Sequence, residues 1–378
     1  MLRINNIKIR TNISNEKVFE IAIKKHKINP NDILEWHISK KSIDARDKND
    51  VHYIYCIDIQ VKNEKKYRHL DKVKKVEFSN LNLTKSKLDL LNSASIIKDI
   101  QIRNLQSKNL DNKKIVIVGA GPAGLFSALT LVNNGFRPII IEQGKSVDQR
   151  KKDIEFFQKT GILNTSSNVQ FGEGGAGTFS DGKLTTGINS PFCRIVLEEF
   201  VKFGAPEEIL YLSKPHIGTD NLITIIKNMR EYIISKGGSF LFNTKVIDFD
   251  IKDNTIKGVL VKNIASPLYS NNNINDNSKS KNISENFIEA DVVVLAIGHS
   301  SRDTFKKIYE KGFDIEKKNF SVGVRIEHLQ EDINKAQYGT ITKLKLPPAE
   351  YKLAYHSSSG RSCYTFCMCP RWICYGFF

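Results

Sequence analysis

The sequence predicts a mixed α/β protein with a parallel sheet at its centre, a small α+β unit in front of it and a β-rich insertion within it. Three observations predict this class. An apolar run at 115–118 leads into a glycine-rich turn and an apolar-faced helix, as a parallel βαβ unit begins. Residues 1–61 contain alternating strands and one helix, and residues 239–262 contain a strand pair.

Length and charge narrow the class further. The chain has 378 residues, which suggests two or three domains of roughly 150 residues each. Its hydrophobic content of 40% excludes a mainly disordered or collagen-like chain. The net charge is +16, and residues 1–114, with 25 Lys or Arg and 14 Asp or Glu, carry +11 of it. This excess fits either RNA or a membrane surface as partner, or scattered solvated lysines; the absence of long basic runs favours the lysines.

Nothing in the sequence predicts a secreted or membrane protein. Six cysteines do not make a disulfide scaffold, and residues 1–20 lack an apolar signal segment. Residues 115–132 are uncharged and long enough to span a membrane, but glycines and a proline interrupt them and indicate a strand, a turn and a helix instead. We therefore expect a cytoplasmic protein.

The amino-terminal unit, residues 1–80, is predicted to be a small basic α+β domain of ferredoxin-like type. Residues 3–10 alternate like a strand, Ser14 or Asn15 caps a helix from Glu16 to Lys27, and residues 50–61 form a second strand. Residues 81–112 are polar and connect this unit to the next domain.

The later part of the chain is predicted to be β-rich. Residues 240–251 and 256–263 form a strand pair that turns at Asp253-Asn254. Residues 263–287 are rich in Asn and Ser and form a disordered surface loop. Residues 292–298 are fully apolar, which indicates a buried parallel strand.

A dinucleotide fingerprint follows the strand at 115–118. Gly119, Gly121 and Gly124 fit G-x-G-x-x-G, in which the glycines permit a tight turn, close approach of a pyrophosphate and helix packing. Leu125, Leu129 and Val132 share a helix face, and Gly135 stands where the helix should end. A second strand from Pro138 to Ile141 leads to Glu142, whose carboxylate is placed to accept hydrogen bonds from ribose hydroxyls.

A second glycine cluster, Gly172, Gly174 and Gly177, lacks the preceding apolar strand and the following helix. The pattern therefore predicts a loop rather than a second nucleotide site. Its small residues suit either close approach to a flat or charged ligand or a purely structural loop.

Several longer motifs carry a family resemblance. Pro122 and Ala123 within the fingerprint, together with NVQFGEGGAGTFSDGKL, KPHIGTD, LAIGHSSRDTF, FSVGVRIEH, AQYG and CYTFCMCP, resemble a bacterial family of uncharacterised FAD-dependent dehydrogenases. This family belongs to the flavoproteins with two dinucleotide-binding domains. The resemblance implies a Rossmann-like FAD-binding domain over 113–319 with an inserted β-meander, followed by an incomplete cap or substrate domain over 320–370. It also implies an FAD-dependent oxidoreductase acting on an unknown small molecule.

The resemblance also assigns cofactor contacts by position. It implies that the following residues bind FAD: Gly119, Gly121, Pro122, Ala123, Gly124, Glu142, Gln143, Gly172, Gly174, Gly175, Gly177, Thr178, Ser180, Lys183, Gly298 and His299. Gln143 departs from the pattern, because related flavoproteins usually carry Arg there. No cysteine lies between Cys56 and Cys193 and no second full fingerprint is present, which argues against a disulfide reductase and a resident NAD(P)H domain. Transient NAD(P)H binding stays open.

Candidate catalytic groups are His299, Lys183 and Arg325, with His216 and Glu327 as further polar partners. A cation near the flavin would stabilise its reduced anion and a histidine would move a proton, although each residue suits a structural hydrogen bond equally well. Cys363, Cys367 and Cys369 are spaced closely enough for a metal or a redox thiol, but no fourth ligand stands nearby. We therefore predict buried, inert cysteines and no metal.

The carboxyl-terminal residues 371–378 depart from the family pattern, which continues with Gly-Gly after Pro370. A reading frame shifted by one base restores these glycines, so we expect an out-of-frame tail and weak or absent FAD binding by this chain. Two alternatives are open: a flavoprotein that associates with RNA through its basic amino-terminal unit, using Tyr53 and Tyr55, or an inactive fragment. RNA is the less favoured partner, since a packed core face explains both tyrosines equally well.

Overall fold

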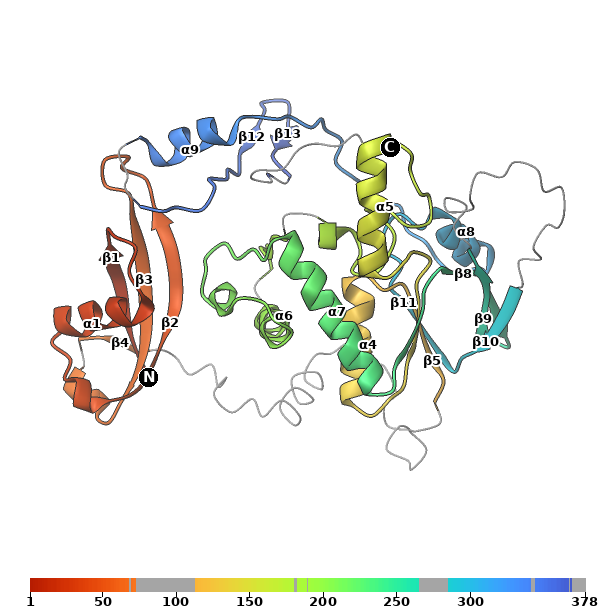
Figure 1. Ribbon diagram of the computed structural model, residues 1–378, viewed down its shortest axis with the longest axis horizontal. Coiled ribbons are helices and arrows are strands. Elements are labelled where there is room, and N and C mark those ends of the chain that lie inside the picture. Colours follow the sequence, from red (N-terminus) through yellow and green to blue (C-terminus); the bar gives the residue numbers. More distant parts are fainter. Residues whose placement is uncertain are drawn as a thin grey trace.

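The computed structural model describes residues 1–67, 69–72, 113–179, 182–188, 190–264, 285–340, 344–366 and 368. The predicted connection 81–112 and the predicted tail 371–378 lie outside these residues. Figure 1 shows a small sheet at one end of the molecule and a second sheet with its helices at the other.

The amino-terminal unit is a four-stranded antiparallel sheet with one helix packed on it. Its sheet order is β2-β3-β1-β4, which is the order of a ferredoxin-like unit with a 3-10 helix in the place of the second helix. Ser14 caps the helix, as predicted, by accepting a hydrogen bond from the amide of Lys17. The sequence reasoning missed the long strand β2. The elements are β1 (Leu2–Ile9), α1 (Asn15–Lys25), η1 (Pro30–Asp32), β2 (Ile33–Asp44), β3 (His52–Val61), η2 (Glu64–Tyr67) and β4 (Asp71–Lys72).

This unit contacts the rest of the chain through the edge strand β2 and through Tyr53 of β3. The amide of Lys41 donates to the carbonyl of Tyr211 at 2.8 Å, and the amide of Ser213 donates to the carbonyl of Lys41 at 3.0 Å. The hydroxyl of Tyr53 donates to the carbonyl of Lys345 at 2.9 Å. Two later segments of the chain are therefore tied to the amino-terminal sheet (Figure 1).

The central sheet is parallel and has the order β11-β5-β6-β7. Numbered in chain order and read from the β7 edge, this is 3-2-1-4, the arrangement of a Rossmann-like fold, and the direction of strand succession reverses between β5 and β11. Ligands bind such sheets at the carboxyl ends of the strands beside that reversal. The strands are β5 (Ile115–Val118), β6 (Ile139–Ile141), β7 (Ser239–Leu241) and β11 (Val292–Leu295).

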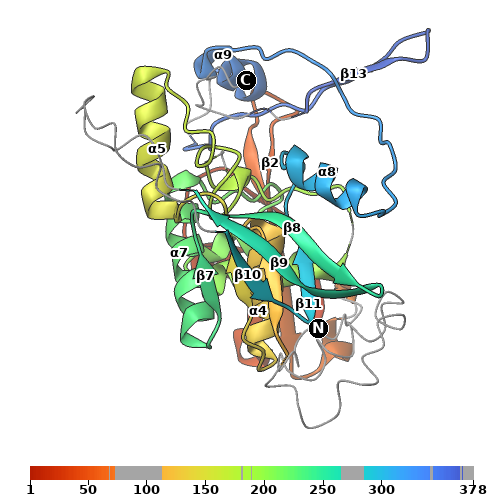
Figure 2. The same cartoon turned by 90° about the vertical axis from the view of Figure 1, so that its right-hand side faces the viewer.

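The two faces of the sheet are covered differently because successive strand residues point to opposite sides. Ile117 and Ile140 pack in a buried cluster with residues of α4 and α7. Val116 and Val118 pack in another cluster with Phe249 and its neighbours, which belong to the antiparallel sheet β10-β9-β8 (Figure 2). The covering elements are α4 (Pro122–Asn133), α7 (Thr219–Ser235), β8 (Thr244–Lys252), β9 (Thr255–Asn263) and β10 (Glu285–Glu289).

Three expectations for this region need correction. The predicted strand from 240 to 251 is two strands, because β7 joins the parallel sheet and β8 joins the antiparallel one. The predicted loop 263–287 is shorter, because Asn263 ends β9 and residues 285–287 begin β10, while 265–284 lie outside the described residues. The strand at 292–295 is parallel as predicted but not buried, since it forms the sheet edge and leaves Val292 and Leu295 each 45% exposed.

The remaining elements surround the sheet or follow it. The turn predicted at Asp253-Asn254 is confirmed, with positive φ at both residues. Residues 313–329 form an exposed extended segment. None of the helices in the described part of the chain is long and apolar enough to cross a membrane. These elements are α5 (Val147–Thr160), η5 (Ala176–Phe179), α6 (Pro191–Lys202), η6 (Glu207–Leu210), α8 (Arg302–Glu310), α9 (Gln330–Tyr338), β12 (Ala354–His356) and β13 (Ser362–Tyr364).

Candidate functional site

The fingerprint turn lies between the carboxyl end of β5 and the start of α4. Gly119 has φ +103°, and a Cβ built on it would lie 2.4 Å from the carbonyl oxygen of Ala296, just beyond β11. A Cβ on Gly124 would lie 1.9 Å from the carbonyl oxygen of Gly119. The fold itself therefore requires these two glycines, and they place the turn at the point where the strand order reverses.

Gly121 differs from the other two glycines. Its φ of −70° and ψ of −177° suit any residue, and a Cβ built on it would meet only the Cα of Gly175, at 3.9 Å. Neither backbone strain nor packing within the protein demands a glycine here. A methyl group would fit here, so the glycine leaves the backbone bare beside the first residues of α4.

The start of α4 is exposed and carries no cap. No side chain caps it, no acidic residue stands in its first turn, and Pro122 and Ala123 are exposed. The first helical hydrogen bond runs from the amide of Leu125 to the carbonyl of Gly121, so earlier amides have no partner within the helix. The positive end of the helix dipole thus faces the space over Gly121.

Glu142 follows β6 and is buried, 6% exposed. Its carboxylate accepts hydrogen bonds from the amides of Ala120 and Gly144, both at 2.8 Å, and of Gly172 at 3.0 Å. A carboxylate has about four acceptor positions, so this set leaves one position for another donor. Glu142 therefore ties the fingerprint turn to the loop after β6 and to the second glycine cluster.

The second glycine cluster packs on the fingerprint, as a loop and not as a second βαβ unit. The amide of Gly174 donates to the carbonyl of Ala120 at 2.8 Å. A Cβ on Gly144 would lie 2.5 Å from the Cα of Gly172, so the two loops touch backbone to backbone. Gly172, Gly174 and Gly175 have positive φ, whereas Gly177 does not. A Cβ added to Gly177 would meet no atom of the described residues within 4 Å.

A buried carboxylate beneath this loop was missed by the sequence reasoning. Glu173 is fully buried, and its carboxylate accepts from the amide of Val147, the first residue of α5, at 2.7 Å. It also pairs with Arg230 of α7. Burial raises the pKa of Glu173 to about 7 despite that cation. The sequence signal that could have revealed Glu173 is an acidic residue within a run of small residues.

The remaining predicted contacts are spread around this site. Thr178 is buried, with its hydroxyl oxygen 2.0 Å from the position of a Cβ on Gly174. Gln143 is half-buried beside Glu142, and Ser180 lies outside the described residues. The segment that touches the fingerprint after β11 is Ala296-Ile297, and Gly298 and His299 follow it in an exposed turn.

Within the described residues, no contact joins the catalytic candidates His299, Lys183 and Arg325 to one another. Lys183 pairs with Glu350 at 3.3 Å, and its backbone bridges to that of His216. Arg325 and Glu327 lie on the exposed segment 313–329. The prediction of buried cysteines is wrong for Cys363, which is exposed at β13; Cys367 and Cys369 lie outside the described residues.

Tyr53 and Tyr55 bear on the RNA alternative. Both are buried, 8% and 2% exposed, and their rings pack in the core of the amino-terminal unit. They therefore present no stacking face to a base.

Family models match both ends of the chain. Residues 319–372 match a model described as the C-terminal domain-like part of FAD-dependent proteins, and residues 1–60 match a domain of unknown function. The chain is 40% identical over 372 residues to an uncharacterised protein of Clostridium beijerinckii, covering 98% of this chain and 62% of that protein. It is 32% identical over 76 residues to the FAD-dependent monooxygenase apdD of Emericella nidulans, 18% of this chain and 12% of that protein.

Solved structures similar to the chain include THI4 of Thermovibrio ammonificans, with a TM-score of 0.34, 15% identity and coverage of 60% of this chain and 70% of that one. Another is glycerol-3-phosphate dehydrogenase of Bacillus halodurans complexed with FAD, with a TM-score of 0.31, 17% identity and coverage of 56% and 38%. The chain spans about three fifths of the length of the Clostridium relative. The FAD-dependent domain match supports FAD, predicted from the fingerprint motifs, as the cofactor of this Rossmann-like fold.

Proposed function

We propose that residues 113–300 bind the adenosine diphosphate half of FAD and that the protein is an FAD-dependent oxidoreductase of the dehydrogenase type. The observation that carries this proposal is the glycine at position 121, which neither backbone strain nor the protein's own packing requires. A pyrophosphate above the start of α4 would lie against its bare backbone. The position is also the one where ligands bind parallel sheets of this order.

The start of α4 supplies what a pyrophosphate needs. The amides of Ala123 and Gly124 have no partner within the helix, and the dipole of a 12-residue helix favours negative charge at this end. Gly119 and Gly124 keep the turn tight enough for the amides to reach the ligand. We infer that the backbone, rather than any basic side chain, holds the phosphates.

Glu142 supports the adenosine side of the proposed site. Three of its acceptor positions hold backbone amides, and the position that remains can accept a hydrogen bond from a ribose hydroxyl. Its negative charge would repel a 2′-phosphate, which favours FAD or NAD(H) over NADP(H). Gln143 stands next to it as the outer contact.

The flavin end of the ligand is assigned to the second glycine cluster and the turn after β11. The exposed backbone of Ala176 and Gly177 and the turn at Gly298-His299 are the candidates that contact it. When bound, the flavin supplies the electron transfer, and the protein supplies orientation and charge. His299 stays the candidate for moving a proton, whereas Lys183 already neutralises Glu350.

The other parts of the chain receive supporting roles in this proposal. In this proposal, the part of the amino-terminal unit that the structure describes, 1–67 and 69–72, stands outside the cofactor fold, and the segment from 320 onward begins the domain that covers a small-molecule substrate. The hydrogen bonds from Tyr53 and Lys41 keep the first unit in place beside these segments.

Competition among nucleotides tests the proposed function. ADP should bind the purified chain, and FAD, whose affinity for this chain is expected to be low, should compete for the same site, whereas FMN, which lacks the adenosine half, should not compete. Equilibrium dialysis with each nucleotide, followed by displacement of ADP with FAD or FMN, measures this. Tight FMN binding or absence of ADP binding would contradict the assignment.

A further inference from the structure

Arg150 of α5 is a charged residue with no exposed surface (0% relative accessibility). Buried guanidinium groups are usually paired with carboxylates, but Arg150 donates instead to backbone carbonyls. The acceptors are the carbonyl oxygens of Asn168 at 2.7 Å, Val169 at 2.8 Å, Gly172 at 3.4 Å, Glu173 at 2.6 Å and Gly175 at 2.8 Å. All five acceptors belong to the stretch 168–175, so one side chain gathers the whole loop.

The guanidinium stays charged in this position. Burial lowers the pKa of Arg150 to about 10, while the negative charges of Glu142 and Glu173 act in the opposite direction. The cation also lies over the ring of Phe179, 4.8 Å from its centroid. At neutral pH the loop is therefore held by charge-assisted hydrogen bonds, which are stronger than neutral ones.

The loop is shaped to receive this side chain. Gly172 has φ +124°, and a Cβ built on it would lie 2.4 Å from the Cδ of Arg150. With its carbonyls turned toward Arg150, the loop turns amides toward the fingerprint: Gly172 donates to Glu142 and Gly174 donates to Ala120. Arg150 and the fingerprint turn thus hold opposite sides of the same backbone.

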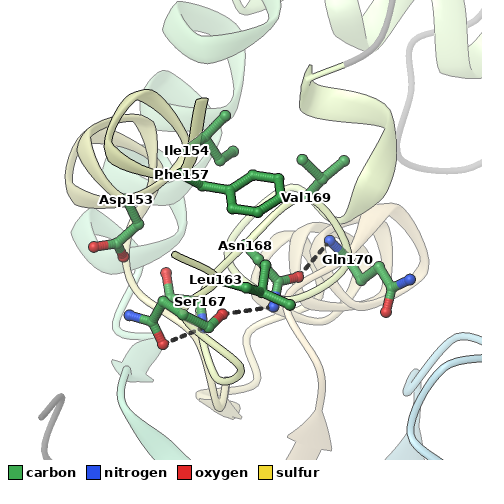
Figure 3. A pocket seen from close by; sticks show the side chains of 9 residues that line it. Asp153, Ile154, Phe157, Leu163, Ser167, Asn168, Val169 and Gln170 are labelled. Atoms are coloured by element: carbon green, nitrogen blue, oxygen red, sulfur yellow. Dashed lines mark hydrogen bonds between the residues drawn. The ribbon is translucent and has the colours of Figure 1, made fainter. Parts of the chain in front are cut away.

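The adjoining stretch encloses a small cavity. The cavity, of about 40 Å³, lies between α5 and residues 163–170 (Figure 3) and is large enough for a water molecule. Asn164 and Asn168 line it and are engaged in hydrogen bonds within their own turns. Hydrogen bonds within these turns therefore fix the path of this part of the chain together with the packing of Val169 on the core.

We propose that Arg150 is a positioning residue of the dinucleotide site, which holds the backbone of residues 168–175 in the arrangement that meets the fingerprint turn. The proposal rests on the proposed function, because the site in question is the one assigned to FAD. Arg150 itself touches no ligand in this scheme. It acts through the backbone of Gly172 to Gly175.

Amide hydrogen exchange in the ligand-free chain tests the positioning directly. In Arg150→Met, the amides of Gly172 and Gly174 should exchange at least about tenfold faster than in the parent, while those of Leu125 and Leu129 in α4 keep their parent rates. Arg194→Met, on the exposed face of α6, is the matched control and should change neither group. Unchanged exchange at Gly172 and Gly174 in a folded Arg150→Met protein would overturn the proposal.

Ligand binding separates this proposal from the proposed function. Arg150→Ala should bind ADP at least about tenfold more weakly than the parent, and low concentrations of guanidinium ion should restore binding by refilling the space of the lost side chain. A parent chain that does not bind ADP refutes the proposed function, while the exchange rates still decide the positioning. If the Arg150 variants do not fold, Gly172→Ala perturbs the same contact from the loop side, and unchanged exchange there would count against the proposal.

Discussion

Gly121 and Gly124 provide the sharpest test of the site, because the structure assigns them opposite roles. In Gly124→Ala the new Cβ lies 1.9 Å from the carbonyl oxygen of Gly119, so the turn must move away from α4. Overpacking of this kind costs about 1–3 kcal/mol, and the short distance places the expected loss at about 3 kcal/mol. In Gly121→Ala the new Cβ has no neighbour closer than 3.9 Å, and φ of −70° is allowed for alanine.

Gly121→Ala should therefore fold at least as stably as the parent. Removing a glycine at a compatible backbone position stabilises a protein by about 0.4–1 kcal/mol through the unfolded state. The same methyl group occupies the space assigned to the pyrophosphate, so ADP affinity should fall at least about tenfold, or about 1.4 kcal/mol.

Urea denaturation followed by circular dichroism measures the first effect, and isothermal titration with ADP measures the second. The two variants are each other's controls, since both add one methyl group to the same turn. The reasoning is refuted if Gly121→Ala is destabilised as much as Gly124→Ala, or if it binds ADP as the parent does.

Three further substitutions test the surrounding contacts. Glu142→Gln places an amide group against backbone amides and should destabilise the protein by about 1–3 kcal/mol in urea denaturation, whereas Glu198→Gln in an exposed helical pair should change stability by less than about 0.5 kcal/mol. Burial raises the pKa of Glu173 to about 7 from an ordinary 4.5, so the folded state holds the proton more tightly than the unfolded state. Its contribution to the free energy of unfolding is then greatest below about pH 4.5 and falls by about 3 kcal/mol as the pH rises to about 7. Glu173→Gln should remove this loss. If the free energy of unfolding changes with pH equally in parent and variant between about pH 5 and about pH 8, the reasoning is contradicted. Tyr53→Phe deletes the hydrogen bond to Lys345 and should cost about 1 kcal/mol, with faster amide exchange at residues 344–346 as the local readout.

Much of the cofactor fold is predictable because its signals are local. The strand at 115–118, the turn glycines, the helix face of Leu125 and Leu129 and the acid at 142 follow one another within 28 residues, and the structure has each of them in order. Hydrophobic periodicity and glycine conformation act over a few residues, so a single sequence reveals them.

Strand pairing is less visible in the sequence. Residues 239–241 and 244–252 read as one strand because both are rich in β-formers and only two residues separate them, yet they belong to different sheets. The apolar run at 292–295 predicts burial, but burial depends on what lies beside a strand, and β11 stands at an edge. Pairing partners are set by residues distant in the chain, which the pattern of one segment does not contain.

The sequence by itself determined that a strand, a glycine-rich turn, a helix and an acid occur in the order of a dinucleotide site. It also placed most of the basic excess in residues 1–114, ahead of the strand at 115–118. Only the tertiary structure decided that Gly119 and Gly124 serve the fold while Gly121 leaves room for a ligand, and that Arg150 gathers the loop that meets them. The reason is physical: the conformational freedom of glycine is a local property. The space around a glycine and the partners of a buried charge depend instead on segments that only folding brings together, from 18 residues away (Arg150 to Asn168) to 177 residues away (Gly119 to Ala296).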